Sequence, residues 1–423
     1  MKVLRSSLPA ARAAIAALTD RRGTAYERVL PQARRIVESV RRQGDPALLR
    51  LRAQLDGIPS QVPLQIPEVE LRLAWESTPA EMRQALKTAA RNIRAFAARQ
   101  LPRNFDLKPA PGVVTGQRVV PLASVGCYIP SGRYPLPSTL LMTVIPAQVA
   151  GVPRIVAVSP NPAKETLAAA AMLGVTEFYR VGGAHAIAAL AYGTPSLPRV
   201  DKIVGPGNAW VTAAKKLVSF DCSIDMLAGP TEIVVASESG DSACIAADLV
   251  AQAEHDPDAV AILITSNAAL AKAVAAESKT RASGNKLATA ALAKHGLALI
   301  AKSVEETRDL VNRIAPEHLT VDTAADLAWV RNAGSVFIGG WSAQPLGDYV
   351  SGPNHTLPTS GLARTRSGLS VLDFVKLVTV QEYTQAGARQ LGPAAIRLAN
   401  AEGLRGHAEA IRARGVKDGG AHE

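Results

Sequence analysis

The chain has 423 residues, of which 48% are hydrophobic and 20% charged, a composition typical of a globular protein with two or more domains. Its formal net charge is +11, and residues 1–100 carry most of the excess, with 18 Lys and Arg against nine Asp and Glu. A basic surface can bind nucleic acid, but only 4% of the residues are aromatic and no basic run alternates with them, so we expect a solvated helical face and no nucleic-acid partner.

The first hundred residues are predicted to be helical. Leu, Ile, Ala and Val recur at helical spacing in residues 1–21 and about 25–52, and a further helix is expected at about 78–99. The longest uncharged stretch, 134–153, contains four prolines and is a poor candidate for a membrane span. The three cysteines include no CxxC pair, which indicates a reducing compartment. We therefore expect a cytoplasmic protein that does not associate with membranes.

From residue 112 onward, short β-branched runs alternate with Ala-rich helical segments. Strands are predicted at 154–158, 178–181, 202–204, 232–235, 260–264, 297–301 and 335–338. Helices are predicted between them, at 163–173, 184–192, 208–218, 242–254, 267–280 and 304–314. This alternation indicates an α/β fold with parallel sheets covered by helices. Two blocks, about 126–231 and 232–340, suggest two related Rossmann-like units, although the chain contains no GxGxxG fingerprint.

The expected domain organisation has four parts. Residues 1–21 form an N-terminal helical arm, and residues 370–423 form a C-terminal helical tail. Residues 22–125 and 232–369 form a first α/β domain, and residues 126–231 form a second one with the glycine-rich turns.

Several polar clusters contain side chains that bind metal ions. Gln252 and His255 lie three residues apart near a predicted helix end, so both can face one ion. Asp348 and His407 could complete a set of nitrogen and oxygen ligands. The alternative is that His255 only interacts with the carboxyl end of its helix.

Glu317 and His318 follow Pro316, where the helix 304–314 should end in a rigid turn. An imidazole beside a carboxylate can transfer protons near neutral pH. A Glu-His pair on the surface without a function is the alternative.

Glycine-rich turns separate predicted strands from helices. They are Gly182-Gly183-Ala184-His185 and Gly205-Pro206-Gly207-Asn208, and a third junction, 225–232, contains Thr231. Such turns at the carboxyl ends of parallel strands bind ligands in many α/β proteins, but glycine there can also serve only a tight turn.

Ten motifs, in this order, resemble the histidinol dehydrogenase family from about residue 25 to about residue 410. They are Gly126–Pro130, Val181–Ala184, Gly205–Ala209, Asp225–Pro230, Gln252–His255, Pro316–Leu319, Gly334–Phe337, Gly347–Tyr349, Asn354–Thr359 and Thr379–Glu382, followed by Glu402 and His407. The resemblance implies a zinc-dependent enzyme that oxidises L-histidinol through L-histidinaldehyde to L-histidine with two NAD+. It also implies a homodimer whose C-terminal tail reaches the partner's site.

The resemblance assigns roles to individual residues. The implied acid–base pair is Glu317 and His318, and the implied ligands of one Zn2+ per subunit are Gln252, His255, Asp348 and His407. The residues implied to bind NAD+ are Tyr128, His185 and Asn208. The residues implied to contact the substrate are Thr231, Gln252, His255, His318, Asp348, His355, Glu402 and His407.

Three positions differ from the usual family pattern. His185 replaces a Gln that touches the cofactor, and imidazole cannot reproduce both hydrogen bonds of an amide. Thr231 stands where Ser is more common, and Leu227 replaces a common Pro. The main alternative function is a related zinc- and NAD-dependent dehydrogenase acting on another amino- or sulfo-alcohol. A metal-dependent hydrolase and a basic nucleic-acid-binding protein are alternatives from other classes.

Overall fold

The computed structural model describes residues 1–20, 24–132 and 134–418, which divide into two compact units. The first unit comprises Met1–Gln100 and Leu122–Phe374, and the second comprises Leu101–Pro121 and Val375–Glu423. The expected boundary between residues 21 and 22 lies outside the described residues.

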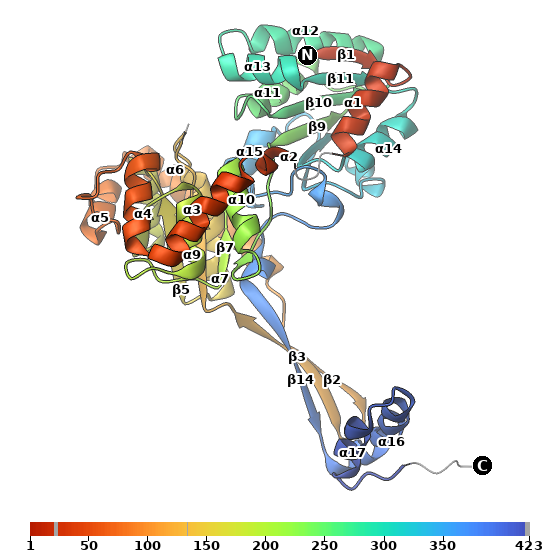
Figure 1. The fold of residues 1–423 in the computed structure, drawn as a ribbon. Coiled ribbons are helices and arrows are strands. Elements are labelled where there is room, and N and C mark those ends of the chain that lie inside the picture. Colours follow the sequence, from red (N-terminus) through yellow and green to blue (C-terminus); the bar gives the residue numbers. More distant parts are fainter. Residues whose placement is uncertain (21–23, 133, 419–423) are drawn as a thin grey trace. The chain divides into compact units, whose positions relative to one another are not determined.

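A six-stranded parallel sheet belongs to the first unit (Figure 1). Its strands are, in spatial order, β1 (Lys2–Arg5), β11 (Leu297–Ile300), β10 (Val260–Thr265), β9 (Glu232–Ala236), β12 (His318–Val321) and β13 (Ser335–Ile338). The central strands β9 and β10 are almost continuously apolar, as expected for strands covered on both faces.

Helices cover both faces of this sheet. One face carries α11 (Ser242–Ala253), α12 (Ala268–Arg281) and α13 (Lys286–Lys294), and the other carries α1 (Pro9–Thr19) and α14 (Val304–Ile314). Successive side chains of β9 point to opposite faces of the sheet. Ile233 and Val235 pack in the core beneath α11, α12 and α13, and Val234 packs in the core beneath α1 and α14.

The N-terminal segment differs from the prediction of a continuous helix over residues 1–21. Lys2–Arg5 form strand β1, which pairs in parallel with β11, and the helix begins only at Pro9. The alternation within β1 is too short to be separated from the Ala-rich helical pattern that follows it.

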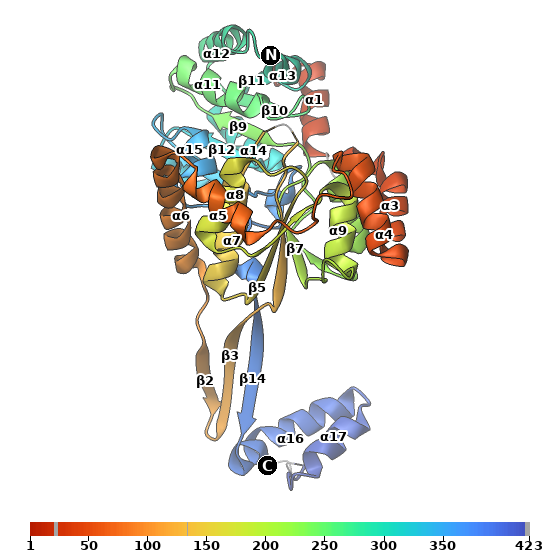
Figure 2. The same ribbon diagram turned by 90° about the vertical axis from the view of Figure 1, so that its left-hand side faces the viewer.

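A five-stranded parallel sheet also lies in the first unit. Its order is β6 (Glu177–Arg180), β5 (Arg154–Ser159), β4 (Ser124–Tyr128), β7 (Lys202–Val204) and β8 (Ser223–Ile224). One side carries α3 (Leu30–Gln43), α4 (Asp45–Leu51), the π-helical turn η1 (Arg52–Asp56), α9 (Gly183–Tyr192) and α10 (Ala209–Val218) (Figure 2). The other side carries α5 (Glu68–Glu76), α6 (Ala80–Gln100), α7 (Pro137–Ala150) and α8 (Lys164–Leu173).

The two sheets share one strand order. In each, the first strand of the block, β4 or β9, lies between the second and the fourth, which is the doubly wound order of mononucleotide-binding units. The predicted α/β class with two related parallel-sheet units is therefore confirmed. Helices α3–α6 pack with the five-stranded sheet, although the sequence had suggested grouping them with residues 232–369.

Helix α7 was not predicted, because Pro146 interrupts its pattern and its residues are apolar on every side. Nearly all of its side chains are buried between α6 and α8. No helix among the described residues is long and apolar enough to cross a membrane.

The second unit contains an antiparallel sheet and two helices. The sheet order is β14 (Val375–Tyr383), β3 (Val113–Pro121) and β2 (Phe105–Ala110), and the helices are α16 (Gln385–Ala401) and α17 (Arg405–Arg412). The expected helical tail 370–423 therefore contains the strand β14 before its two long helices. The remaining short elements of the chain are α2 (Thr24–Glu27), η2 (Ala324–Ala328), α15 (Gln344–Tyr349), η3 (Leu362–Arg364) and η4 (Val371–Phe374).

Candidate active site

The predicted acid–base pair lies at the amino edge of the six-stranded sheet. His318 is the first residue of β12 and Glu317 directly precedes it, so the pair does not project from a turn as the sequence suggested. Strand β12 runs beside β9, and His318 aligns with Ile233. Parallel pairing therefore brings Glu317 and His318 next to Thr231 and Glu232, which lie at the start of β9.

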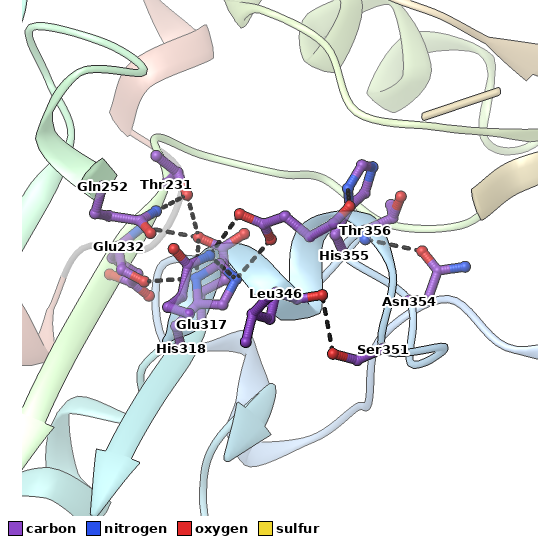
Figure 3. A network of polar contacts seen from close by, with 12 residues as sticks. Thr231, Glu232, Gln252, Glu317, His318, Leu346, Ser351, Asn354, His355 and Thr356 are labelled. Carbon is purple, nitrogen blue, oxygen red and sulfur yellow. Dashed lines mark hydrogen bonds and ion pairs between the residues drawn. The ribbon is translucent and has the colours of Figure 1, made fainter. Parts of the chain in front are cut away.

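Glu317 is buried and receives two hydrogen bonds through Oε2. The hydroxyl of Thr231 donates one of 2.6 Å, and the backbone N–H of Glu232 donates one of 2.8 Å (Figure 3). Burial raises the pKa of Glu317 to about 7, although His318 and both hydrogen bonds act in the opposite direction. A carboxyl group with this pKa can hold or release a proton near neutral pH.

His318 has different partners on its two ring nitrogens. Nδ1 lies 3.2 Å from the carbonyl oxygen of Glu232, which can only accept a hydrogen bond. Nε2 lies 3.2 Å from Nε2 of Gln344 and 3.6 Å from Oδ1 of Asp348. Burial acts to lower the pKa of His318, but the carboxylates of Glu317 and Asp348 raise it overall.

Helix α15 contributes Gln344 and Asp348 to the site. The side-chain amide of Gln344 donates a hydrogen bond of 2.6 Å to Oδ2 of Asp348. Burial acts to raise the pKa of Asp348, but the imidazole of His318 lowers it overall. Asp348 therefore stays ionised beside His318. Gln344 could not be identified from the sequence, because a lone Gln before a Pro has no recognisable pattern.

His355 connects α15 with α7. Its Nδ1 donates to the carbonyl oxygen of Asp348 at 2.9 Å, and its Nε2 lies 3.2 Å from the hydroxyl of Thr139. Burial lowers the pKa of His355, so a neutral imidazole is favoured.

A cavity of about 340 Å3 opens beside these groups. His318, Asp348 and His355 contribute to its wall, together with Phe337 from β13 and Leu346 from α15. A small polar molecule in this cavity would contact two imidazoles and a carboxylate, and the rest of the wall is mainly apolar. Substrate pockets usually combine an apolar wall with a few polar groups in this way.

The predicted metal ligands do not form a complete metal site among the described residues of one chain, but one of them has the features of a ligand. Among the described residues, no three His, Cys, Asp or Glu side chains gather as a metal site. Gln252 is 1% exposed, and its Oε1 has no hydrogen-bond partner in the part of the chain that the structure describes. Its Nε2 donates to Thr231. An unsatisfied, buried amide oxygen is costly unless a ligand or ion completes it.

Glu402 and His407 belong to the second unit, whereas Gln252, His255 and Asp348 belong to the first. Glu402 follows the last residue of α16, and His407 lies in the first turn of α17. Both side chains are exposed.

The residues predicted to bind the cofactor lie at the carboxyl edge of the five-stranded sheet. Tyr128 ends β4, and its hydroxyl accepts a hydrogen bond of 3.1 Å from the backbone N–H of Gly183. Asn208 begins α10 after β7 and caps that helix through the N–H groups of Trp210 and Val211. Strands β4 and β7 flank the point where the strand order reverses, the usual ligand site of such sheets.

His185 faces away from solvent. Its side chain is 0% exposed, and Nε2 lies 2.9 Å from Oδ2 of Asp56, which also accepts from the backbone N–H of Gly182. The imidazole is thus joined to the glycine-rich turn through Asp56, which no sequence motif indicates.

Parallel sheets of doubly wound order and a buried carboxyl–imidazole pair beside a cavity are the features of an α/β enzyme. The family model of histidinol dehydrogenase matches residues 19–415. The chain is 47% identical over 392 residues to the histidinol dehydrogenase of Geobacillus kaustophilus, covering 90% of this chain and 92% of that one. It is 45% identical over 396 residues to that of Synechococcus sp., covering 90% and 91%. The crystal structure of histidinol dehydrogenase from Elizabethkingia anophelis superposes with a TM-score of 0.92 at 32% identity and covers 98% of both chains.

The chain therefore belongs to the histidinol dehydrogenase family. It is an NAD-dependent oxidoreductase of histidine biosynthesis, as the sequence motifs predicted. The alternative of a related dehydrogenase for another amino- or sulfo-alcohol is not favoured by these matches.

Proposed function

We propose that this enzyme oxidises L-histidinol through bound L-histidinaldehyde to L-histidine and that Glu317 and His318 transfer the protons. The observation that carries this assignment is the burial of a carboxyl group and an imidazole side by side, with Nδ1 of His318 3.6 Å from Oε2 of Glu317. Burial raises the pKa of Glu317 to about 7, and the neighbouring carboxylates raise the pKa of His318, so each group can act as an acid or a base.

In the first step, Nε2 of His318 takes the hydroxyl proton while the carbinol carbon gives a hydride to NAD+. In the second step, ionised Glu317 removes a proton from a water molecule that adds to the aldehyde carbon. The resulting hydrate anion gives a second hydride to another NAD+ and becomes the carboxylic acid. Two hydrides and two protons leave the alcohol and the added water molecule, and one water oxygen enters the product, which balances the conversion to the carboxylic acid. Ionisation of this acid then releases a third proton.

Zinc is proposed as the second cofactor, with Gln252, His255 and Asp348 of one subunit as ligands. The unpartnered amide oxygen of Gln252 and the ionised carboxylate of Asp348 support this set. When bound, Zn2+ would hold the imidazole and amine of histidinol in place and would not take part in redox chemistry. Thr231 and His355 are proposed to contact the substrate within the same subunit.

NAD+ is proposed to bind at the carboxyl edge of the five-stranded sheet, near Tyr128 and Asn208. His185 would act there through the Gly182–Gly183 turn, since its imidazole is buried. The reversal of strand order beside β4 supports this location.

The protein is proposed to be a cytoplasmic homodimer in which Glu402 and the zinc ligand His407 come from the partner subunit. The antiparallel sheet of the second unit supports association, because large apolar side chains remain exposed on it, namely Phe105, Leu107, Leu377, Val378, Val380 and Tyr383. The absence of any disulfide among the three cysteines is consistent with the cytoplasm.

The test is an assay of NADH formation with L-histidinol, with and without a chelator, in which histidine is quantified in parallel. Two NADH per histidine, lost on chelation and restored by Zn2+, is the expected result. One NADH per turnover, with free aldehyde as product, would contradict the two-step assignment. Activity that persists without any divalent ion would contradict the zinc assignment alone.

A further inference from the structure

Asp56 is a shielded carboxylate that accepts two hydrogen bonds from the glycine-rich turn at the carboxyl edge of the five-stranded sheet. Its Oδ2 lies 2.9 Å from the backbone nitrogen of Gly182 and 2.9 Å from Nε2 of His185. A carboxylate can only accept hydrogen bonds, so the N–H of Gly182 and the Nε2–H of His185 both donate to this one oxygen. The side chain of Asp56 is 7% exposed and that of His185 is 0% exposed, so water has little access to either hydrogen bond.

The turn that Asp56 contacts consists of two adjacent glycines. Gly183 has a φ of +56°, and a Cβ on Gly182 would lie 2.6 Å from Cγ of Pro160. Both positions therefore require glycine, the residue that has the most backbone freedom to lose when the chain becomes ordered. A turn built in this way needs contacts from other elements to keep one conformation.

Two side chains from separate elements supply those contacts. The N–H of Gly182 donates to Asp56 of η1, and the N–H of Gly183 donates to the hydroxyl of Tyr128 at the end of β4. Asp56 differs from Tyr128 in that it also holds a side chain from the first turn of α9, that of His185. The carboxylate thus fixes both the glycine-rich turn and the helix that follows it.

The position of Asp56 is itself fixed by contacts of η1. Arg52 is 0% exposed, and its Nη2 donates to the carbonyl oxygens of Pro59 and Val62 at 3.2 and 2.7 Å. The carbonyl oxygen of Asp56 accepts a hydrogen bond of 3.4 Å from the side-chain amide of Asn161, which follows β5. π-Helical turns such as η1 are rare and are frequently found at functional sites.

We propose that Asp56 is a positioning residue for NAD+, which holds the Gly182–Gly183 turn and the start of α9 in the conformation that receives the cofactor. The imidazole of His185 connects the carboxylate to α9 and is the second member of this pair. The inference rests on the proposed location of NAD+ at the carboxyl edge of the five-stranded sheet. A turn that is ordered before binding spares the cofactor the cost of ordering it, so Asp56 contributes to cofactor affinity and not to the chemical steps.

The test compares D56A with D45A. Asp45 provides the matched control, because its Oδ2 also accepts from a backbone N–H and a side chain, both of Ser196, which lies beyond the carboxyl end of α9. We expect D56A to raise the Kd for NADH about 10-fold, the effect of leaving the turn in its binding conformation in roughly a tenth of the molecules. At saturating NAD+, kcat should stay within about twofold of wild type. D45A should keep the wild-type Kd.

Fluorescence titration with NADH measures each Kd, and steady-state rates with histidinol measure kcat. An unchanged Kd in D56A, or the same increase in D45A, would overturn the inference. A large loss of kcat at saturating NAD+ would also contradict it, because a residue that only positions the turn acts through affinity.

The variant H185F tests whether the two side chains act as a unit. Phenylalanine fills the buried site and removes the hydrogen bond to Asp56. We expect H185F to raise the Kd for NADH less than D56A does, since the hydrogen bond from Gly182 remains. The double variant D56A/H185F should bind NADH as tightly as D56A alone. Effects that multiply in the double variant, or a wild-type Kd for H185F, would contradict the pairing.

Hydrogen exchange of the wild-type enzyme, followed by mass spectrometry, separates this inference from the proposed cofactor site and does not depend on the folding of any variant. NADH should slow exchange in peptides that span residues 182–186 and 208–212. If NADH protects neither segment, the location of the cofactor is wrong. If it protects both and D56A still binds NADH like the wild type, only the role of Asp56 is wrong.

Discussion

The hydroxyl of Thr231 donates a hydrogen bond of 2.6 Å to Oε2 of Glu317, and the oxygen of this hydroxyl accepts a hydrogen bond from the side-chain amide of Gln252. This hydroxyl therefore joins a proposed metal ligand to the proposed base of the second step. Only a side chain that can both donate and accept a hydrogen bond at this position can link Gln252 to Glu317.

Replacing Thr231 tests that link. T231V removes the hydroxyl at nearly constant volume and leaves two buried polar groups short of a partner, which should destabilise the protein by about 1–3 kcal/mol. It also removes a hydrogen bond that lowers the pKa of Glu317, so the pH profile of aldehyde oxidation should move to higher pH. T231S keeps the hydroxyl and serves as the control. Urea unfolding and the pH profile measure the two effects, and a T231V profile identical to that of T231S would argue against the link.

E317Q should separate the two oxidation steps. The amide cannot accept a proton from water, so aldehyde oxidation should fall by about 10²- to 10⁴-fold, the usual contribution of a general base. Alcohol oxidation should fall much less, because His318 remains. In the wild type, aldehyde oxidation should rise with pH through about 7, since only ionised Glu317 acts as a base. Rates with histidinol and with histidinaldehyde, measured between pH 6 and 9, decide the matter. An equal loss in both steps would count against the division of labour.

The free energy of unfolding should also depend on Glu317. The pKa of Glu317 is about 7 in the folded protein, whereas an ordinary glutamate in the unfolded chain has a pKa of 4.5. Between pH 4.5 and pH 7, the folded state therefore holds a proton that the unfolded chain has released. This group therefore contributes less stability as pH rises from 4.5 to 7, the reverse of a carboxylate in an ion pair. His318, whose pKa is also raised, acts in the same direction. E317Q should become more stable relative to wild type as pH rises across this window. Thermal unfolding at several pH values tests this, and parallel curves for the two proteins would contradict it.

The sequence allowed the general architecture to be predicted because buried parallel strands are locally distinctive. Val260–Thr265 and Arg154–Ser159, for example, are short β-branched runs between Ala-rich helices, and both are strands of parallel sheets. Pairing over long distances was not predictable in this way. Strand β14 pairs with β3, although the two strands are more than 250 residues apart in the sequence. The alternation of apolar and polar residues in these strands hardly differs from the residue pattern at the end of a helix.

The candidate site was predictable only where side chains carry chemistry in recognisable pairs. Glu317 and His318 stand out as neighbours, and the structure brings them together with Thr231, Gln252 and Asp348. Gln344 and Asp56 were missed, since each gains its significance from partners distant in sequence. For the same reason the burial of His185 could not be foreseen from a glycine-rich turn.

A buried ion pair supports the turn that carries Asn208. Nζ of Lys215 lies 2.6 Å from Oδ1 of Asp225, and Oδ2 of Asp225 accepts from the backbone N–H of Gly205. K215M leaves the carboxylate of Asp225 buried without its counter-charge, so we expect a loss of about 3–5 kcal/mol in the free energy of unfolding and a raised KM for NAD+. The control is K294M, which breaks the exposed pair of Lys294 and Asp258 and should cost about 0–1 kcal/mol. Similar losses for the two variants would show that the pair at Asp225 has no special role.

Mixing two inactive variants tests whether the active site is shared between subunits. One subunit carries H318N and the other carries H407N, and the two are unfolded and refolded together. If His407 completes the partner's site, each mixed dimer has one site with both residues intact and one with neither. Random association then gives mixed dimers in about half of the population and restores about a quarter of the wild-type activity. If both residues act in the same subunit, every site has one defect and the mixture stays inactive. Each variant refolded alone provides the baseline, and size-exclusion chromatography with light scattering verifies that the refolded protein is dimeric.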